Sequence, residues 1–198
     1  MQPTNLQIRP LTAADLPRVK EFADRVIGTN YYSLKELKEI LSRSQLDGEV
    51  FSLILVDTLG RVQGVRITYP PGQWLTGKGQ GLRPDLWPVE RKHCAYFQSL
   101  FIAPELAGQG LGTRLSRQVI DRLQAHGAKA IIAHSWKESP HDSSGRYLRA
   151  LGFRLVTSHP EYWKQVDYEC PRCGRPCLCT AEEMILVFDS NSNKTEAP

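Results

Sequence analysis

Residues 99–127, SLFIAPELAGQGLGTRLSRQVIDRLQAHG, constrain the fold more than any other part of the chain. An apolar run at residues 100–102 suits a buried strand, and glycines follow at positions 108, 110 and 112. Apolar residues then recur every four positions, which predicts one buried stripe on an amphipathic helix: Leu111, Leu115, Val119 and Leu123. Gly127 is suited to end this helix. The segment therefore predicts a strand, a glycine loop and a helix in direct succession.

A strand, glycine loop and helix in this order can hold a phosphate group. The first amides of a helix have no internal partner and lie at the positive end of its dipole, and glycines let an anion approach them. The chain lacks the Gly-Lys-Ser/Thr ending of a P-loop, and its glycines are too evenly spaced for the dinucleotide fingerprint. The sequence predicts a pyrophosphate site here; a tight turn without a ligand is the alternative.

Residues 99–115 resemble the acetyl-coenzyme A signature of the GNAT family of N-acetyltransferases. In that signature a strand ends in Val-x-Pro, and Arg/Gln-x-x-Gly-x-Gly/Ala and a long helix follow. Residues 107–112, Ala-Gly-Gln-Gly-Leu-Gly, fill the motif, with alanine in place of the usual first Arg or Gln. Residues 6–19 resemble the opening strand and helix of the family, and residues 147–156 resemble its last helix and the next strand. The resemblance covers most of residues 6–157.

This resemblance implies an α/β (α+β) fold with a mixed central sheet of about six to seven strands and about four helices, in a single domain over residues 1–190. It implies N-acetyl transfer from acetyl-coenzyme A, a co-substrate, to a primary amine of a small molecule or protein by direct attack. A backbone N–H near residues 101 and 102 would polarise the thioester carbonyl. The implied coenzyme contacts are Leu100, Phe101, Ile102, Gly108, Gln109, Gly110, Leu111, Gly112 and Thr113.

The general acid departs from the family pattern. In the family a tyrosine four residues before the glycine of Gly-Phe usually protonates the coenzyme thiolate, and this chain has Leu148 there. Tyr147 is adjacent, but one residue along a helix is a rotation of about 100°. Tyr147 is the candidate acid that the sequence offers.

The general base departs from the pattern as well. Cys94 and Gln98 stand where the family often has glutamates on the central strand. A glutamine side chain cannot take up a proton, and a buried thiol is a poor base at neutral pH. Glu90 and His93 are therefore the candidate catalytic bases, with His134 as a further candidate. A non-catalytic coenzyme A sensor or interaction protein with the same fold is the alternative function.

Four of the five cysteines lie within ten residues, in the spacing Cys-x₂-Cys-x₃-Cys-x-Cys. This clustering favours metal over a disulfide framework, and tetrahedral zinc suits four sulfurs in a closed structural site. Two disulfides, with one cysteine left over, or redox-active thiols are the alternatives, and an adaptor built on the cluster ranks last among functions. The sequence predicts a structural zinc in a knuckle at residues 168–181, held by Cys170, Cys173, Cys177 and Cys179.

The remaining segments complete the expected organisation. Residues 70–93 are rich in proline and glycine yet carry large apolar side chains, so we expect an ordered flap over the acceptor side. Tyr31 and Tyr32 are expected at a helix–helix corner, which lines the acceptor pocket in GNAT folds; two half-buried aromatic side chains without a ligand are the alternative. Residues 162–168 are expected to continue the strand that begins at residue 153, and residues 191–198 to form a disordered tail.

Bulk composition is that of an ordinary globular protein. The formal net charge of +4 is too small and dispersed to argue for nucleic acid, and no apolar run approaches the roughly 18 residues of a membrane span. Residues 1–5 do not resemble a signal peptide. We therefore expect a cytoplasmic monomer or homodimer that binds acetyl-coenzyme A and an amine acceptor, with no membrane and no nucleic acid as partner.

Overall fold

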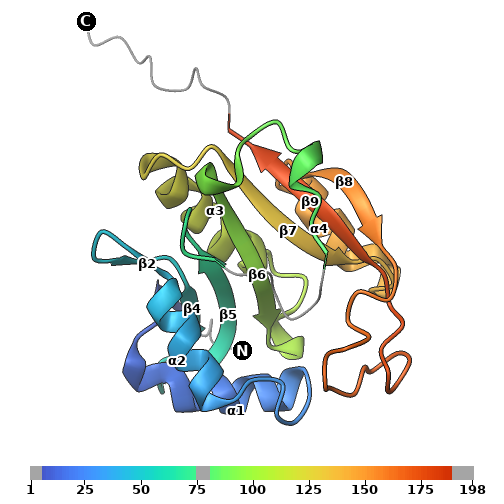
Figure 1. The fold of residues 1–198 in the computed structure, drawn as a ribbon. Coiled ribbons are helices and arrows are strands. Elements are labelled where there is room, and N and C mark those ends of the chain that lie inside the picture. The colour runs from blue at the N-terminus through green and yellow to red at the C-terminus, as the bar shows by residue number, and fades with distance from the viewer. Residues whose placement is uncertain (1–5, 75–80, 189–198) are drawn as a thin grey trace, which may run out of the picture.

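The protein is described by a computed structural model that covers residues 6–74 and 81–188 (Figure 1). The expected tail at residues 191–198, and most of the glycine run at residues 77–81 within the flap, lie outside these residues. No helix in the described part of the chain is both long enough and apolar enough to cross a membrane.

The described residues form four α-helices, as the family resemblance implied: α1 (Leu16–Val26), α2 (Leu34–Arg43), α3 (Leu111–Ala125) and α4 (Ser143–Ala150). Local chemistry sets their starts. Pro17 lies in the first turn of α1, where its missing N–H costs nothing. At the start of α2, the Glu36 amide donates to Ser33 Oγ (3.1 Å) and the Ser33 amide donates to Glu36 Oε2 (2.7 Å). This reciprocal pair is a capping box.

Seven strands form one mixed sheet in the order β1-β4-β5-β6-β7-β9-β8, which confirms the predicted fold class. Their bounds are β1 (Gln7–Pro10), β4 (Leu53–Val56), β5 (Val62–Tyr69), β6 (Cys94–Ile102), β7 (Ala130–Trp136), β8 (Arg154–His159) and β9 (Ala181–Val187). A separate two-stranded ribbon joins β2 (Gln45–Leu46) to β3 (Glu49–Val50). The strand expected at residues 162–168 is wrong: these residues form turns, because no neighbouring strand pairs with them.

Helices cover both faces of the sheet. The apolar stripes of α1 and α2 pack on one face, and those of α3 and α4 pack on the other, so two hydrophobic cores form. Strand β4 shows the division: Ile54 and Val56 belong to the first core, whereas Leu53 and Leu55 belong to the second. Successive side chains of a strand point to opposite faces, which explains why this strand is apolar at every position.

Strands β6 and β7 separate partway along their length, and this separation positions the site. Their parallel pairing joins residues 94–97 to residues 130–133 and then stops, although β6 continues to Ile102 and β7 to Trp136. Gln98 is an extra residue in β6, since Phe97 pairs with Thr68 and Ser99 pairs with Ile67. Such a bulge bends a strand. The sheet therefore opens between β6 and β7 in its middle.

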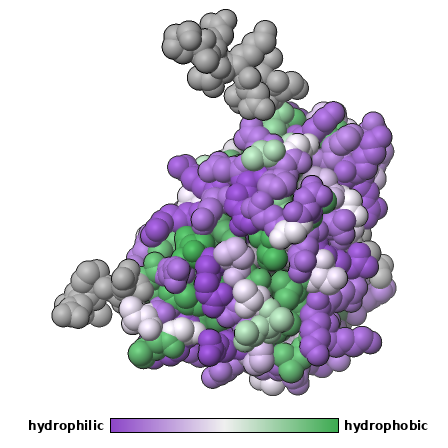
Figure 2. Space-filling model, turned by 90° about the vertical axis from the view of Figure 1, so that its left-hand side faces the viewer, coloured by the Kyte–Doolittle hydropathy of each residue, from purple (hydrophilic) through white to green (hydrophobic). Residues whose placement is uncertain are grey.

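One side of the molecule carries an apolar surface patch. Figure 2 shows the side that lies to the left in Figure 1, where hydrophobic residues gather within a surround of hydrophilic ones. Strand β1 is an edge strand of the sheet, and Leu6 before it and Ile8 within it are partly exposed residues that pack against the second core. The described residues do not indicate what covers this patch.

Candidate active site

A cavity of about 770 Å³ occupies the gap between β6 and β7. Its size is within the range of small-molecule and cofactor pockets. Residues from β6, from the glycine loop before α3, from β7 and from the start of α4 line it, together with residues of the α1–α2 corner and of the β8–β9 connection. Among its described lining residues, none carries a carboxylate, and Arg66 is the one permanently charged side chain. The cavity therefore does not attract cations through acidic side chains.

The glycine loop forms one end of this cavity. Gly108 and Gly110 have φ angles of +77° and +73°, and a Cβ atom at either position would meet nothing within 4 Å. These left-handed conformations favour glycine and leave open space beside the first amides of α3. Gly112 serves packing instead, because a Cβ there would approach Leu100 Cδ2 at 2.9 Å. Of the nine coenzyme contacts expected from the sequence, Gln109 does not line the cavity; the other eight do.

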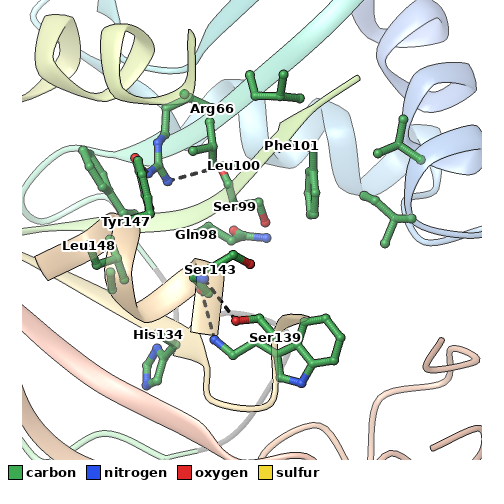
Figure 3. A pocket seen from close by; sticks show the side chains of 18 of the residues that line it. Arg66, Gln98, Ser99, Leu100, Phe101, His134, Ser139, Ser143, Tyr147 and Leu148 are labelled. Carbon is green, nitrogen blue, oxygen red and sulfur yellow. Dashed lines mark hydrogen bonds between the residues drawn. The ribbon is translucent and has the colours of Figure 1, made fainter. Parts of the chain in front are cut away.

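Arg66 of β5 is buried beneath this cavity, with 2% of its surface exposed. Its Nη2 donates to the Tyr147 hydroxyl (2.8 Å), its Nε to Ser116 Oγ (3.1 Å) and its Nη1 to the Ser99 carbonyl (3.3 Å). The guanidinium carbon lies 4.0 Å from the centroid of the Phe97 ring. Figure 3 shows Arg66 and Tyr147 pointing toward each other beside Ser99. Burial lowers the pKa of Arg66, although arginine keeps its charge in proteins.

An aromatic wall lines part of the cavity. It consists of five cavity-lining residues: Tyr31, Phe101, Tyr162, Trp163 and Tyr168. Tyr31, from the α1–α2 corner, makes edge-to-face contacts with Phe101 and Tyr168, with ring centroids 5.9 and 5.8 Å apart. Tyr162 and Trp163 contact each other at 4.9 Å. The wall therefore joins the first helices to the β8–β9 connection around an uncharged space.

His134 of β7 lines the cavity where the strands separate. Its Nδ1 is 2.9 Å from the Tyr96 hydroxyl and 3.4 Å from the Tyr162 hydroxyl. Burial, assisted by the nearby His159, lowers the pKa of His134 to about 3. The imidazole is therefore neutral at physiological pH and is a weak base.

Glu183 of β9 anchors the described end of the flap. Its carboxylate is fully buried and accepts from Trp87 Nε1 (2.5 Å), from the Arg83 amide (3.0 Å) and from His159 Nε2 (2.7 Å). Trp74, before the undescribed residues 75–80, stacks on Tyr96 with ring centroids 4.9 Å apart. Both described ends of the flap are therefore packed against the sheet.

Glu90 and His93 do not reach the cavity. They precede β6, and neither is among the residues that line the cavity. Glu90 is exposed, and its ion pair with Lys92 (2.8 Å) lowers its pKa. His93 lies five residues before Gln98, roughly 16 Å along an extended strand. Of the four catalytic candidates in the sequence, Tyr147 and His134 line the cavity, whereas Glu90 and His93 do not.

The four clustered cysteines are all free thiols, and their sulfur atoms lie within 4.8 Å of one another. The Sγ–Sγ separations are 3.8 Å for Cys170–Cys179 and 3.7 Å for Cys173–Cys179. A tetrahedron with Zn–S distances of about 2.3 Å has edges of about 3.8 Å, whereas a disulfide needs about 2.05 Å. The Leu178 amide and the Tyr168 hydroxyl donate to Cys173 Sγ and Cys177 Sγ at 3.3 and 3.4 Å. The donor set therefore fits zinc, with supporting hydrogen bonds.

Comparison with known protein families decides the membership of the chain. The sequence model of the acetyltransferase (GNAT) family matches residues 28–153, more than half of the sequence. The chain belongs to the GNAT family. No curated protein matches it significantly.

Solved structures share the GNAT fold with this chain at low sequence identity. The ribosomal-protein-S18-alanine N-acetyltransferase of Escherichia coli is 18% identical, with a TM-score of 0.65 over 97% of this chain and 99% of that one. A GCN5-related N-acetyltransferase from Kribbella flavida is 21% identical, with a TM-score of 0.60 over 92% and 98%. YncA from Salmonella typhimurium, solved with its cofactor acetyl-CoA, is 18% identical, with a TM-score of 0.65 over 94% and 96%.

Several cavity residues of this GNAT protein were not recognised from the sequence. Arg66 lines the cavity, and Ser116 accepts a hydrogen bond from it; both are buried polar residues. All eight positions of β5 are buried, so a charged residue in VQGVRITY was an available signal. Trp163 and Tyr168 lacked any such signal, because only the path of the β8–β9 connection brings them to the cavity.

Proposed function

We propose that this GNAT protein transfers an acetyl group from acetyl-coenzyme A to a primary amine. The observation that carries the proposal is the cavity between β6 and β7, which has the glycine loop at one end and the aromatic wall on one side. One such space can hold a thioester and an attacking amine together, which reduces the entropic cost of the reaction. Acetyl-CoA in the structure of YncA supports the choice of donor.

The coenzyme binds with its pyrophosphate on the amides between Gly108 and Thr113. Two left-handed glycines leave these amides accessible, and the dipole of the 15-residue helix α3 favours the negative charge. Beyond the point where β6 and β7 separate, a backbone N–H near Phe101 and Ile102 polarises the thioester carbonyl. Leu100 and Ile102 form the apolar floor of this part of the cavity.

The amine attacks in its neutral form. The described cavity lining offers no carboxylate to stabilise an ammonium ion, and His134, with its pKa near 3, holds a proton poorly. The amine therefore loses its proton to water before or during entry. At neutral pH an α-amine of pKa about 8 is neutral roughly 200-fold more often than a lysine amine of pKa about 10.4. We propose that α-amines and other weakly basic amines are preferred acceptors.

Tyr147 is the proposed general acid. Tyr147 lines the cavity, although the residue stands one position before the usual tyrosine of the family. When the tetrahedral intermediate collapses, the C–S bond breaks, its electron pair moves to sulfur, and the phenol proton passes to the thiolate. The amine nitrogen gives up one proton to solvent, and the Tyr147 phenolate takes one back from solvent, so that the products are the N-acetylated amine and coenzyme A.

The four cysteines are proposed to hold one structural zinc ion. Bound zinc would fix the β8–β9 connection, since a closed Cys₄ site has no position for substrate. Cys170 lines the cavity, and Tyr168 contributes to both the aromatic wall and the hydrogen bond to Cys177. Metal analysis should find about one zinc per chain. A Cys177→Ser variant should lose the metal yet bind coenzyme A normally; a folded, metal-free native protein would contradict the site.

The deciding experiment is an acceptor screen that measures release of the coenzyme A thiol. Peptides with a free α-amine should react faster than N-terminally blocked peptides of the same sequence that carry lysine. Tight coenzyme binding without thiol release from any amine would instead support the non-catalytic coenzyme A protein, which the lack of a carboxylate base in the described cavity favours. A reversed preference for lysine would contradict the neutral-amine argument but leave acetyl transfer in place.

A further inference from the structure

Arg66 presents an unusual electrostatic situation. A guanidinium with 2% of its surface exposed is kept in the protein interior, and within residues 6–74 and 81–188 no carboxylate pairs with it. Removing a charge from water costs several kcal/mol unless other groups compensate. Here the compensating groups are neutral: a phenol, a serine hydroxyl, a carbonyl and a ring face. The charge therefore remains available to a negative group that forms nearby.

Such a negative group forms during the reaction proposed above. When Tyr147 gives its proton to the departing sulfur, a phenolate remains at the position of its hydroxyl. Arg66 Nη2 already donates to that oxygen at 2.8 Å, and the Ser116 hydroxyl lies in hydrogen-bond contact with it. A hydrogen bond with one ionised partner is roughly twice as strong as one between neutral groups, which applies to the Ser116 contact once the phenolate forms. The Arg66 contact, whose donor is already charged, gains the attraction between opposite charges. The existing contacts therefore become stronger at the step in which the thiolate leaves.

We propose that Arg66 is a positioning residue that stabilises the Tyr147 phenolate as coenzyme A leaves, with Ser116 as the second donor. The inference rests on the proposed acetyl transfer. It also explains how a tyrosine displaced by one helical position serves as the acid. Arg66 on β5 supplies the cation and Ser116 on α3 supplies the hydroxyl. Their hydrogen bonds fix the position of the Tyr147 oxygen, so the position does not depend only on where Tyr147 stands along α4.

A purely structural role would differ in its signature. Arg66 also connects β5, α3 and α4, so its loss could reduce stability without any effect on proton transfer. If Arg66 only held the helices in place, its replacement would lower kcat by the same factor in the presence and absence of the Tyr147 hydroxyl. Stabilising a phenolate requires that hydroxyl. The distinction can therefore be measured by a double-mutant cycle.

The test compares Arg66→Lys, Tyr147→Phe and the double variant, with the best acceptor from the screen. Tyr147→Phe should lower kcat about 100-fold, the low end for loss of a general acid, and leave coenzyme A affinity within about twofold. Arg66→Lys should lower kcat about 10-fold in the presence of Tyr147 and have almost no further effect in the Tyr147→Phe protein. The solvent deuterium isotope effect on kcat should fall in Tyr147→Phe, which has no phenol proton to transfer, and should not fall in Arg66→Lys.

Arg122→Lys is the matched control. Arg122 is also a partly buried arginine beside an aromatic ring, with its guanidinium carbon 5.3 Å from the Phe51 centroid, but it does not line the cavity. Its kcat should equal that of the native protein. If Arg66→Lys fails to fold, Ser116→Ala should show the same dependence on Tyr147.

The outcomes separate the two proposals. Equal losses of kcat in both backgrounds, or no loss in Arg66→Lys, would overturn the role of Arg66 while acetyl transfer stands. A native protein that binds coenzyme A but transfers acetyl to no amine would overturn both.

Discussion

Replacing Gly110 by alanine tests the coenzyme site most directly, because α3 has a matched glycine at its other end. Gly110 and Gly127 have φ angles of +73° and +78°, and a Cβ at either position meets nothing within 4 Å. The left-handed conformation costs a non-glycine residue about 1–2 kcal/mol. Both variants should therefore lose about 2–8 °C in Tm. They differ in location, since only Gly110 lines the cavity.

Coenzyme affinity should separate the two variants. A methyl group at residue 110 would occupy the open space beside the first amides of α3 and cost at least one hydrogen bond to a charged group, about 1.5–3 kcal/mol. The Kd for coenzyme A should then rise about 10- to 150-fold in Gly110→Ala and stay unchanged in Gly127→Ala. Calorimetric titration with coenzyme A, alongside thermal unfolding, measures both quantities. Equal affinity of the two folded variants would refute the assignment of the glycine loop.

Two further predictions concern stability. Trp87→Phe removes a hydrogen-bond donor from the buried Glu183 carboxylate and should lower the free energy of unfolding by about 1–3 kcal/mol. Leu86→Ala, at a neighbouring side chain that is 48% exposed, should change it little. Equal losses of the two variants in denaturant titrations would argue against Glu183 as the anchor of this segment. The hydrogen bonds from Arg9, opposed in part by burial, lower the pKa of Asp15 to about 2. The contribution of Asp15 to the free energy of unfolding, on the order of 2 kcal/mol, is present above pH about 4 and is lost as the pH falls toward 2. Unfolding titrations across this pH range should show that the free energy of unfolding decreases less in Arg9→Met than in the native protein. An identical decrease would contradict the Arg9–Asp15 pair.

Periodicity and capping residues predicted the secondary structure well because they act locally. The four-residue apolar repeat predicted α3, and Gly127 predicted its end, two residues after Ala125. The expected strand at residues 162–168 was wrong for the complementary reason. A strand requires a hydrogen-bonding neighbour, and β8 already ends at His159, which pairs with Ala181 at the start of β9.

The site was less predictable, because its chemistry depends on long-range placement. Arg66 and Tyr147 are 81 residues apart in sequence and meet only when α4 packs on the sheet. Glu90 and His93 were candidate bases by residue type. They precede β6, however, so the stretch in which β6 pairs with β7 separates them from the cavity. The glycine loop and the cysteine cluster were recognisable because each is contained in one short segment.

The contact between Tyr31 and Tyr168 has an evolutionary consequence. These residues come from segments that flank the coenzyme-binding sequence on either side, and neither segment contributes to the glycine loop. Mutations in the α1–α2 corner or the β8–β9 connection can thus diversify the choice of acceptor while the donor site is inherited unchanged. The proposed zinc would make the second of these segments tolerant of sequence drift, because four ligands would maintain its path when the residues between them are replaced. Paralogues of this chain should accordingly differ most between residues 160 and 180.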